Sequence, residues 1–173
     1  MSNKILIHSC CAPCAAPSVE RAKLDGYEVA LYFSNSNIYP EAEYHKRLEH
    51  IRKLSEIYEV ILEEDVYDHD AWLKHISGFE NEPEKGLRCQ KCFEFNLART
   101  AQLAERHGYS RFTTTLTLSP HKISKIIFAI GAQFSGYMAY DFKKKNGFLR
   151  SIALADEWGL YRQSYCGCEF SIR

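Results

Sequence analysis

The seven cysteines of this 173-residue sequence stand in three tight groups. The first group holds three thiols, and each of the others holds two: Cys10, Cys11 and Cys14; Cys89 and Cys92; Cys166 and Cys168. Closely spaced thiols bring several sulfur ligands to one metal ion or cluster, whereas buried structural cysteines need no such grouping. An odd number of cysteines in a chain without a visible signal peptide disfavours a disulfide framework. We therefore expect one metal site assembled from three loops.

The number of thiols allows three kinds of chemistry. A structural zinc ion takes four ligands, and two such sites would need an eighth ligand, which His8 can supply. A [4Fe-4S] cluster takes up to four thiolates and leaves three for a second metal, whose open coordination position would suit catalysis. A redox dithiol would use Cys11 and Cys14 and leave the other cysteines unexplained. The thiol count leaves all three interpretations open.

The rest of the sequence indicates the elements that must position these thiols. Short β-type runs alternate with amphipathic stretches, which is typical of βαβ units and a parallel sheet. We expect strands over 4–8, 27–33, 60–62 and 111–117, and helices over 17–26, 40–59, 70–77, 93–108, 121–132 and 150–160. Ligands bind such sheets at the carboxyl ends of the strands. The first cysteine group, the polar loop 34–37 and the Ser119-Pro120 turn should therefore line one crevice.

Composition and charge narrow the class of protein. The apolar fraction of 46% and charged fraction of 25% are ordinary for a globular chain, and no apolar run is long enough for a membrane span. We expect one domain over 1–173, located in the cytoplasm and without a membrane partner. The net charge is zero, but residues 1–85 carry 16 acidic and 9 basic side chains, and residues 86–173 carry 6 and 13. The basic half suits a polyanionic partner, although the two halves can also simply attract each other.

Six blocks along the chain resemble the cobalamin-independent epoxyqueuosine reductases of the QueH type. They are HSCCAPC at 8–14, YFSNSNIYP at 32–40, RCQKCF at 88–93, TTTLTLSPHK at 113–122, DFKKK at 141–145 and LYRQSYCGCEFS at 160–171. The blocks follow the family order and span almost the whole sequence. Two positions vary or depart from the family pattern: Cys14 can be an aspartate in relatives, and Asn96 stands where an arginine is common.

The resemblance implies a fold, a reaction and cofactors. The fold would be Rossmann-like, a parallel α/β sheet with flanking helices and the metal site at the carboxyl ends of the strands. The reaction would reduce the epoxide of epoxyqueuosine at the wobble position of transfer RNA to the cyclopentene of queuosine. The family holds a [4Fe-4S] cluster beside a mononuclear iron, so all seven cysteines become candidate ligands. The electron donor is unknown from the sequence.

The reaction itself suggests further site residues. An iron with an open position can polarise the epoxide C–O bond while the cluster supplies electrons, and a nearby acid would protonate the leaving oxygen. Asp141 and Tyr165 are the candidate acids by position. An ion pair of Asp141 with Lys143 or Lys144 is an equally good interpretation.

Candidate substrate contacts follow from residue chemistry. Asn35 and Asn37 can bind the modified base or its diol, or can simply form a turn. Lys143, Lys144 and Arg162 are candidate phosphate contacts, because backbone charge dominates nucleic-acid affinity. Two other functions remain open at this point: a zinc-stabilised transfer-RNA-binding module, and a thiol oxidoreductase.

Overall fold

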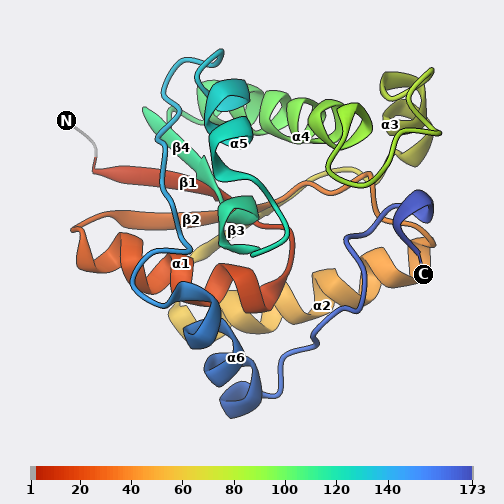
Figure 1. The fold of residues 1–173 in the computed structure, drawn as a ribbon. Helices are drawn as coiled ribbons and strands as arrows, with labels where there is room; N and C mark the ends of the chain where they lie inside the picture. The colour runs from red at the N-terminus through yellow and green to blue at the C-terminus, as the bar shows by residue number, and fades with distance from the viewer. Residues whose placement is uncertain (1–2, 173) are drawn as a thin grey trace.

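The computed structural model describes residues 3–172 and contains one parallel sheet (Figure 1). Its strands are β1 (Lys4–His8), β2 (Glu28–Phe33), β3 (Ile61–Glu64) and β4 (Arg111–Thr114), in the order β3-β2-β1-β4. Every neighbouring pair is parallel. The chain winds outward from β1 through β2 to β3 and then returns to the other side of β1, which makes the β1/β4 gap the switch point of the sheet. The predicted α/β class is confirmed.

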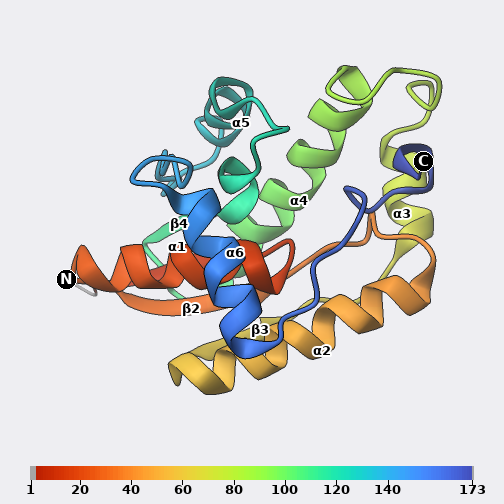
Figure 2. The ribbon, with the colours of Figure 1, turned by 60° about the horizontal axis from the view of Figure 1, so that its bottom comes forward.

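Helices cover both faces of the sheet (Figures 1 and 2). One face packs against α1 (Ala12–Leu24), α2 (Glu41–Tyr58) and α6 (Gly147–Trp158), and the other against α4 (Leu87–Arg106) and α5 (Ser124–Gly131). The short helix α3 (His69–His75) lies beside the C-terminal segment, which ends in the 3-10 turn η2 (Glu169–Ser171). A second 3-10 turn, η1 (Thr115–Leu118), follows β4.

The central strand shows why this sequence forms a covered parallel sheet. Ile5, Leu6 and Ile7 are all fully buried, and consecutive buried residues on a strand point to opposite faces. Ile5 and Ile7 join the core beneath α1 and α2, while Leu6 joins the core beneath α4. A continuous apolar run is what a doubly covered parallel strand requires. No helix in residues 3–172 is both long and apolar enough to cross a membrane.

Two element boundaries differ from the sequence-based expectation near the site. Helix α1 begins before Pro17, because Cys11 is extended and serves as the N-cap while Pro13 occupies the first turn, where the fixed φ of proline fits a helix start. The strand expected to reach residue 117 ends at Thr114, whose hydroxyl accepts a hydrogen bond from the Leu116 amide at 3.1 Å. That local bond turns the chain into η1.

Three helices also start elsewhere than expected. Helix α4 begins directly after Gly86, so both Cys89 and Cys92 lie within its first turns and not ahead of it. Helix α5 begins at Ser124, after an extended Ile123. Helix α6 runs from 147 because Asn146 adopts a left-handed conformation as its N-cap. Asparagine tolerates that conformation better than most residues.

Candidate metal centre

The first cysteine group lies at the switch point of the sheet. β1 ends at His8, and Cys11 caps the N-terminus of α1. The backbone amide of Cys10 donates to Thr115 Oγ1 at 3.2 Å, which ties the loop to the chain leaving β4. The three sulfurs of Cys10, Cys11 and Cys14 lie within 4.8 Å of one another. We call these three residues the cysteine triad.

A buried histidine, His8 at the end of β1, fixes the loop that carries the triad. The two ring nitrogens of His8 lie 2.9 Å from Thr114 Oγ1 and 2.9 Å from the carbonyl oxygen of Ser34. A carbonyl only accepts, so Nε2 carries the proton and Nδ1 accepts from the threonine hydroxyl. Burial lowers the pKa of His8, which keeps the ring neutral. The side-chain amide of Asn35 adds a bond to the Ser9 carbonyl at 2.8 Å. The triad therefore stands on a fixed base.

The triad concentrates negative charge on one sulfur. Hydrogen bonds from the thiols of Cys11 and Cys14 lower the pKa of Cys10 well below its usual range, and the Lys122 ammonium acts in the same direction. The same bond to Cys10 raises the pKa of Cys11 to about 12, and the pKa of Cys14 also rises. Two thiols beside one sulfur of lowered pKa form a site that a cation would stabilise.

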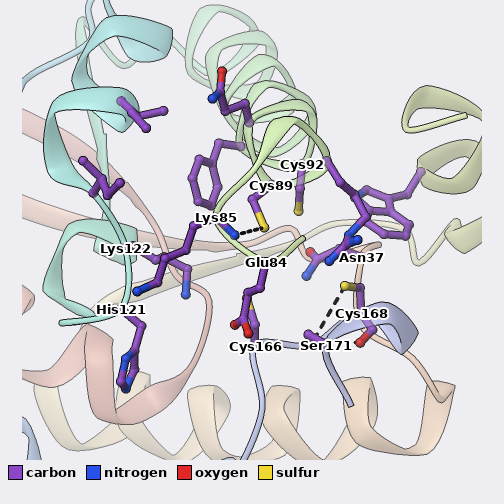
Figure 3. A pocket seen from close by; sticks show the side chains of 16 residues that line it. Asn37, Glu84, Lys85, Cys89, Cys92, His121, Lys122, Cys166, Cys168 and Ser171 are labelled. Carbon is purple, nitrogen blue, oxygen red and sulfur yellow. Dashed lines mark hydrogen bonds between the residues drawn. The ribbon is translucent and has the colours of Figure 1, made fainter. Parts of the chain in front are cut away.

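The other four cysteines line a second, smaller cavity of about 40 Å³. We call them the cysteine quartet: Cys89, Cys92, Cys166 and Cys168. Figure 3 shows Cys89 and Cys92 extending from α4 toward Cys168, with Cys166 on the same C-terminal segment. Burial raises the pKa of both Cys89 and Cys92, and Cys166 adds to the increase for each. The two thiols of α4 therefore favour the protonated form.

Arg47 of α2 holds the C-terminal half of the quartet in place. Its guanidinium donates to the carbonyl oxygen of Cys166 at 2.9 Å and to that of Tyr165 at 3.1 Å. A third bond, at 2.8 Å, reaches Glu43 Oε1 one helical turn earlier. The Arg47 side chain is only 2% exposed, so these bonds act in a poorly screened environment.

Gly167 lets the C-terminal segment pass close to the sheet loops. Its φ of +150° is one that L-residues with side chains rarely adopt, and a Cβ there would lie 3.1 Å from Asn37 Nδ2 and 3.2 Å from Ile38 Cγ1. The Gly167 carbonyl in turn accepts from the Tyr39 amide at 2.8 Å. The contacts of Gly167 thereby fix the position of the two cysteines that flank it, Cys166 and Cys168.

A larger cavity of about 390 Å³ joins the two cysteine groups. The whole triad lines it, together with Cys92 and Cys166 of the quartet, and Asn37, His121 and Lys122 line both cavities. Burial lowers the pKa of Lys122, but the nearby sulfurs, first Cys166 and then Cys10, raise it above its ordinary value. Lys122 is therefore a cation that lines both cavities, and Figure 3 shows it in the lining of the smaller one. The predicted single crevice is confirmed, since Asn35 and Asn37 of loop 34–37 and the Ser119-Pro120 turn also line this cavity.

The two cysteine groups differ in the metal that they fit. Four thiolates around one zinc ion at 2.3 Å would lie about 3.8 Å apart. Among residues 3–172 only the triad brings three ligand atoms within 4.8 Å of one another, so no three quartet sulfurs are that close. Sulfur donors that surround a cavity suit a cluster whose thiolates bind separate irons. The donor chemistry thus fits a cluster at the quartet and one soft metal ion at the triad.

The two predicted asparagines line the large cavity, but both also have structural bonds. Asn35 uses its amide to hold Ser9, as described above. Asn37 Oδ1 accepts from Asn96 Nδ2 at 3.2 Å, while Asn96 Oδ1 is buried and has no partner in the described part of the chain. An Asn37–Asn96 pair therefore stands where the two cavities meet.

Two further predicted residues reach the large cavity from the C-terminal segment. Arg162 is exposed and lines it, and none of the described residues pairs with its guanidinium. Tyr165 also lines it and donates its hydroxyl proton to the carbonyl oxygen of Tyr39 at 2.6 Å.

The remaining predicted residues do not line either cavity. Asp141 accepts from the Ser124 hydroxyl at 3.4 Å and from the Lys143 backbone amide at 3.2 Å. The Lys143 ammonium donates to the carbonyl oxygen of Lys122 at 2.7 Å. Lys144 is exposed, and its backbone amide donates to the Asp141 carbonyl. This group braces the segment that carries Lys122.

Four residues at the site were not predicted: Arg47, Trp72, Arg88 and Lys122. Arg47 had a signal, since it lies three residues after Tyr44 and four before Ile51 on the apolar stripe of its helix. Arg88 and Lys122 stand in the blocks RCQKCF and TTTLTLSPHK, which resemble the family but assign no role to either residue, and Trp72 stands outside every block.

Comparisons with known proteins cover nearly the whole chain. Residues 5–173 match the family model described as "Epoxyqueuosine reductase QueH". The protein of that name from Streptococcus pyogenes serotype M1 is 37% identical over 98% of this chain and 70% of its own length. The one from Staphylococcus aureus is 38% identical over 97% of this chain and 75% of its own length. The one from Thermotoga maritima is 32% identical over 97% and 90%.

Proposed function

The chain belongs to the epoxyqueuosine reductase QueH family of oxidoreductases, and we propose that it converts epoxyqueuosine to queuosine at the wobble position of transfer RNA. One observation carries this proposal beyond family membership. The seven thiols divide into a triad and a quartet, and both open on one cavity of about 390 Å³. A redox centre and a separate substrate-facing metal site are what the reaction needs.

The balance of the reaction defines what the site must do. Each turnover takes one epoxide, two electrons and two protons, breaks both C–O bonds of the epoxide, and gives one alkene and one water. The electrons come from an external donor. We assign a [4Fe-4S] cluster to the quartet and a mononuclear iron to the triad. When bound, these groups would supply one-electron transfer and a Lewis acid beside the cavity.

The chain supplies binding and charge for this chemistry. Base-modifying enzymes commonly extrude the target nucleotide into a pocket. Phe148 and Pro120 give the large cavity an apolar wall, and Arg162, Gln163 and Tyr165 give it a polar one. The Phe148 side chain remains 40% exposed, so its ring can stack on an entering base. Gln163 has a buried, unpartnered Oε1 among the described residues and would accept from a diol hydroxyl, as would Asn37.

Proton delivery falls to a group at the cavity. Tyr165 lines the cavity and carries a proton on its hydroxyl, and it is our first candidate for protonating the leaving oxygen. Asp141 stays a second candidate, although it would have to act through Ser124 or water. Arg162 would contact a phosphate near the target nucleotide. Lys143 and Lys144 lie outside the cavity lining, so any phosphate they contact would belong to the flanking strand.

The test is anaerobic purification followed by an assay on transfer RNA that carries epoxyqueuosine. We expect a brown protein with about five irons per chain, four in a cluster and one alone. With a chemical reductant it should form queuosine, detected by mass spectrometry of the released nucleosides. Transfer RNA that already carries queuosine is the substrate control.

Three results would contradict the proposal. A colourless protein that holds stoichiometric zinc after iron–sulfur reconstitution and still binds transfer RNA would indicate a zinc-stabilised binding module. Thiol-exchange activity that survives iron chelation would indicate a thiol oxidoreductase. An intact iron–sulfur protein that leaves epoxyqueuosine unchanged would show that the chain acts on another substrate.

A further inference from the structure

Two buried N–H groups beside the quartet have no hydrogen-bond acceptor in residues 3–172: Trp72 Nε1 and Arg88 Nε. Both side chains line the quartet cavity. We infer that Trp72 and Arg88 are positioning residues for the metal cluster, donating hydrogen bonds to its sulfur atoms and setting its reduction potential. This inference rests on the proposed function, because it requires a cluster at the quartet.

Trp72 is the more informative of the two residues. It is fully buried and packs against Cys168, with Cys92 at the edge of the same small core. Its ring stacks on His69, with centroids 5.4 Å apart and planes inclined by 19°, and also lies against Phe170, with centroids 6.4 Å apart. These contacts fix the ring orientation.

The indole therefore lies beside two quartet cysteines, Cys92 and Cys168, and lines the same cavity as their sulfurs. A buried donor without an acceptor normally costs stability. An anionic sulfur beside the indole N–H would accept its hydrogen bond and remove that cost. Thiolate or sulfide would supply that acceptor.

Arg88 shows the same imbalance in its charge. It is 3% exposed, and its Nη1 donates only to the backbone carbonyls of Glu80 and Glu82. No carboxylate among the described residues lies within salt-bridge distance of it. The guanidinium also packs over the Phe170 ring, 5.2 Å from its centroid. Buried charges are normally paired, and a cluster with four thiolates would carry the missing negative charge.

The two groups together act on the electron affinity of the cluster. Reduction adds one electron to the cluster and makes it more negative. Hydrogen bonds to sulfur and a nearby positive charge therefore stabilise the reduced form more than the oxidised form. Both residues should raise the reduction potential, which makes the cluster easier to charge from the external donor.

The experiment measures the midpoint potential of the reconstituted enzyme by anaerobic titration, followed by visible absorbance and electron paramagnetic resonance. Trp72→Phe keeps an aromatic ring and removes the N–H. At a fixed potential it should lower the ratio of reduced to oxidised cluster about tenfold, which is about 59 mV for one electron. Trp158→Phe is the matched control. The chain has two tryptophans, and Trp158 packs against Tyr58 on the far face.

Substitutions of Arg88 provide a second, independent test. Arg88→Gln removes the charge and should lower the potential more than Trp72→Phe, while Arg88→Lys keeps the charge and should restore part of the loss. A purely structural role would lower thermal stability or cluster occupancy without moving the potential. Wild-type potentials in cluster-loaded Trp72→Phe and Arg88→Gln would overturn the inference.

A measurement on the unaltered protein covers the case in which the variants fail to assemble. Enzyme grown with ¹⁵N-labelled indole is reduced, and pulsed electron paramagnetic resonance then detects nitrogen coupled to the cluster. We expect a coupled ¹⁵N signal from Trp72, which Trp158→Phe retains. Absence of the signal would overturn the inference while leaving the proposed function intact. A wild-type protein that forms no cluster would contradict both.

Discussion

The cysteine triad is made by a single stretch of chain, since its thiols follow β1 and enter α1, whereas the cysteine quartet joins α4 to the distant C-terminal segment. The triad sulfurs already lie within 4.8 Å of one another. The quartet sulfurs surround a cavity, and Arg47 holds the backbone of the segment that carries two of them. A local turn thus preorganises one site, and tertiary packing assembles the other.

This difference has an energetic meaning. Bringing distant segments together costs loop-closure entropy, which the quartet must recover through packing and metal bonds. The triad incurs little of that cost, because its thiols are neighbours in the chain. Metal binding should therefore be coupled to folding of the C-terminal segment at the quartet, and largely uncoupled from folding at the triad.

Cysteine substitutions test the comparison with the largest effect. Cys92→Ser should abolish the cluster absorbance, because it removes one of the quartet ligands. Cys14→Ser should keep that absorbance and lose about one iron per chain together with activity. Visible spectra and iron analysis of the two anaerobically reconstituted variants make the distinction. Cluster colour that survives in Cys92→Ser, or disappears in Cys14→Ser, would reverse our assignment of the metals.

Arg47 tests the dependence of the quartet on tertiary packing. Arg47→Met should lower the free energy of unfolding by about 3–5 kcal/mol, because it leaves Glu43 in a buried site without its charged partner. Urea unfolding of the metal-free protein measures this. Arg52→Met is the matched control on the same helix. Arg52 pairs with Glu64 at 55% side-chain exposure, so its loss should cost less than about 1 kcal/mol. Equal effects of the two substitutions would contradict the role given to Arg47.

Part of this architecture was readable from the sequence. β1 and β2 are continuous apolar runs, because strands covered on both faces need them. The grouping of thiols predicted a metal site, and the order of strands predicted the crevice that contains it. These patterns lie within short stretches of the chain, so they can be recognised from a single sequence.

The rest depends on contacts between distant residues. The start of α1 is set by an extended Cys11 and not by Pro17, and the end of β4 is set by the hydroxyl of Thr114. The division of seven thiols into triad and quartet follows from where the C-terminal segment docks. Trp72 belonged to no sequence pattern, and the RCQKCF block that contains Arg88 indicated no role for it, because the surroundings of both residues come from α3, α4 and that segment together.

Asp65 links the loop beside the triad to the helix that carries Cys89 and Cys92, so its substitution tests a contact on which both cysteine groups depend. It bonds the Ser34 hydroxyl at 2.7 Å, beside the base of the triad, and Arg99 Nη2 at 2.7 Å on the helix that carries half of the quartet. Burial raises the pKa of Asp65, but the bonds from Arg99 and Ser34 outweigh it and leave the pKa below its ordinary value. The folded carboxyl therefore holds its proton less tightly than the unfolded one.

The sign of the pH dependence follows. Ionised Asp65 contributes its full stabilisation above about pH 4 and loses it as the pH falls further. Asp65→Asn should lower the free energy of unfolding by about 2 kcal/mol at pH 7 and by less at pH 3. Urea unfolding at both pH values measures the difference. A penalty that is the same at both pH values would mean that the carboxylate charge is not involved.

Arg162 gives the smallest effect and separates substrate binding from metal binding. It lines the large cavity but not the quartet cavity. Arg162→Ala should weaken transfer-RNA binding severalfold and reduce the slope of log affinity against log salt by about one unit or slightly less. Cluster absorbance should stay unchanged. Arg106→Ala, in the last turn of α4, is the control and should bind like wild type. An unchanged salt slope in Arg162→Ala would remove Arg162 from the phosphate contacts.

Two of the four quartet thiols lie on either side of Gly167, far along the chain from the other two, and this has a consequence for biosynthesis. During translation the triad leaves the ribosome before α4, and Cys166 and Cys168 follow after both. Domains fold progressively as they emerge. The nascent chain can therefore present a three-thiol site while half of the other ligand set has yet to be translated. Iron loading should be ordered in time, with the triad competent first and cluster insertion delayed until the late segment is delivered.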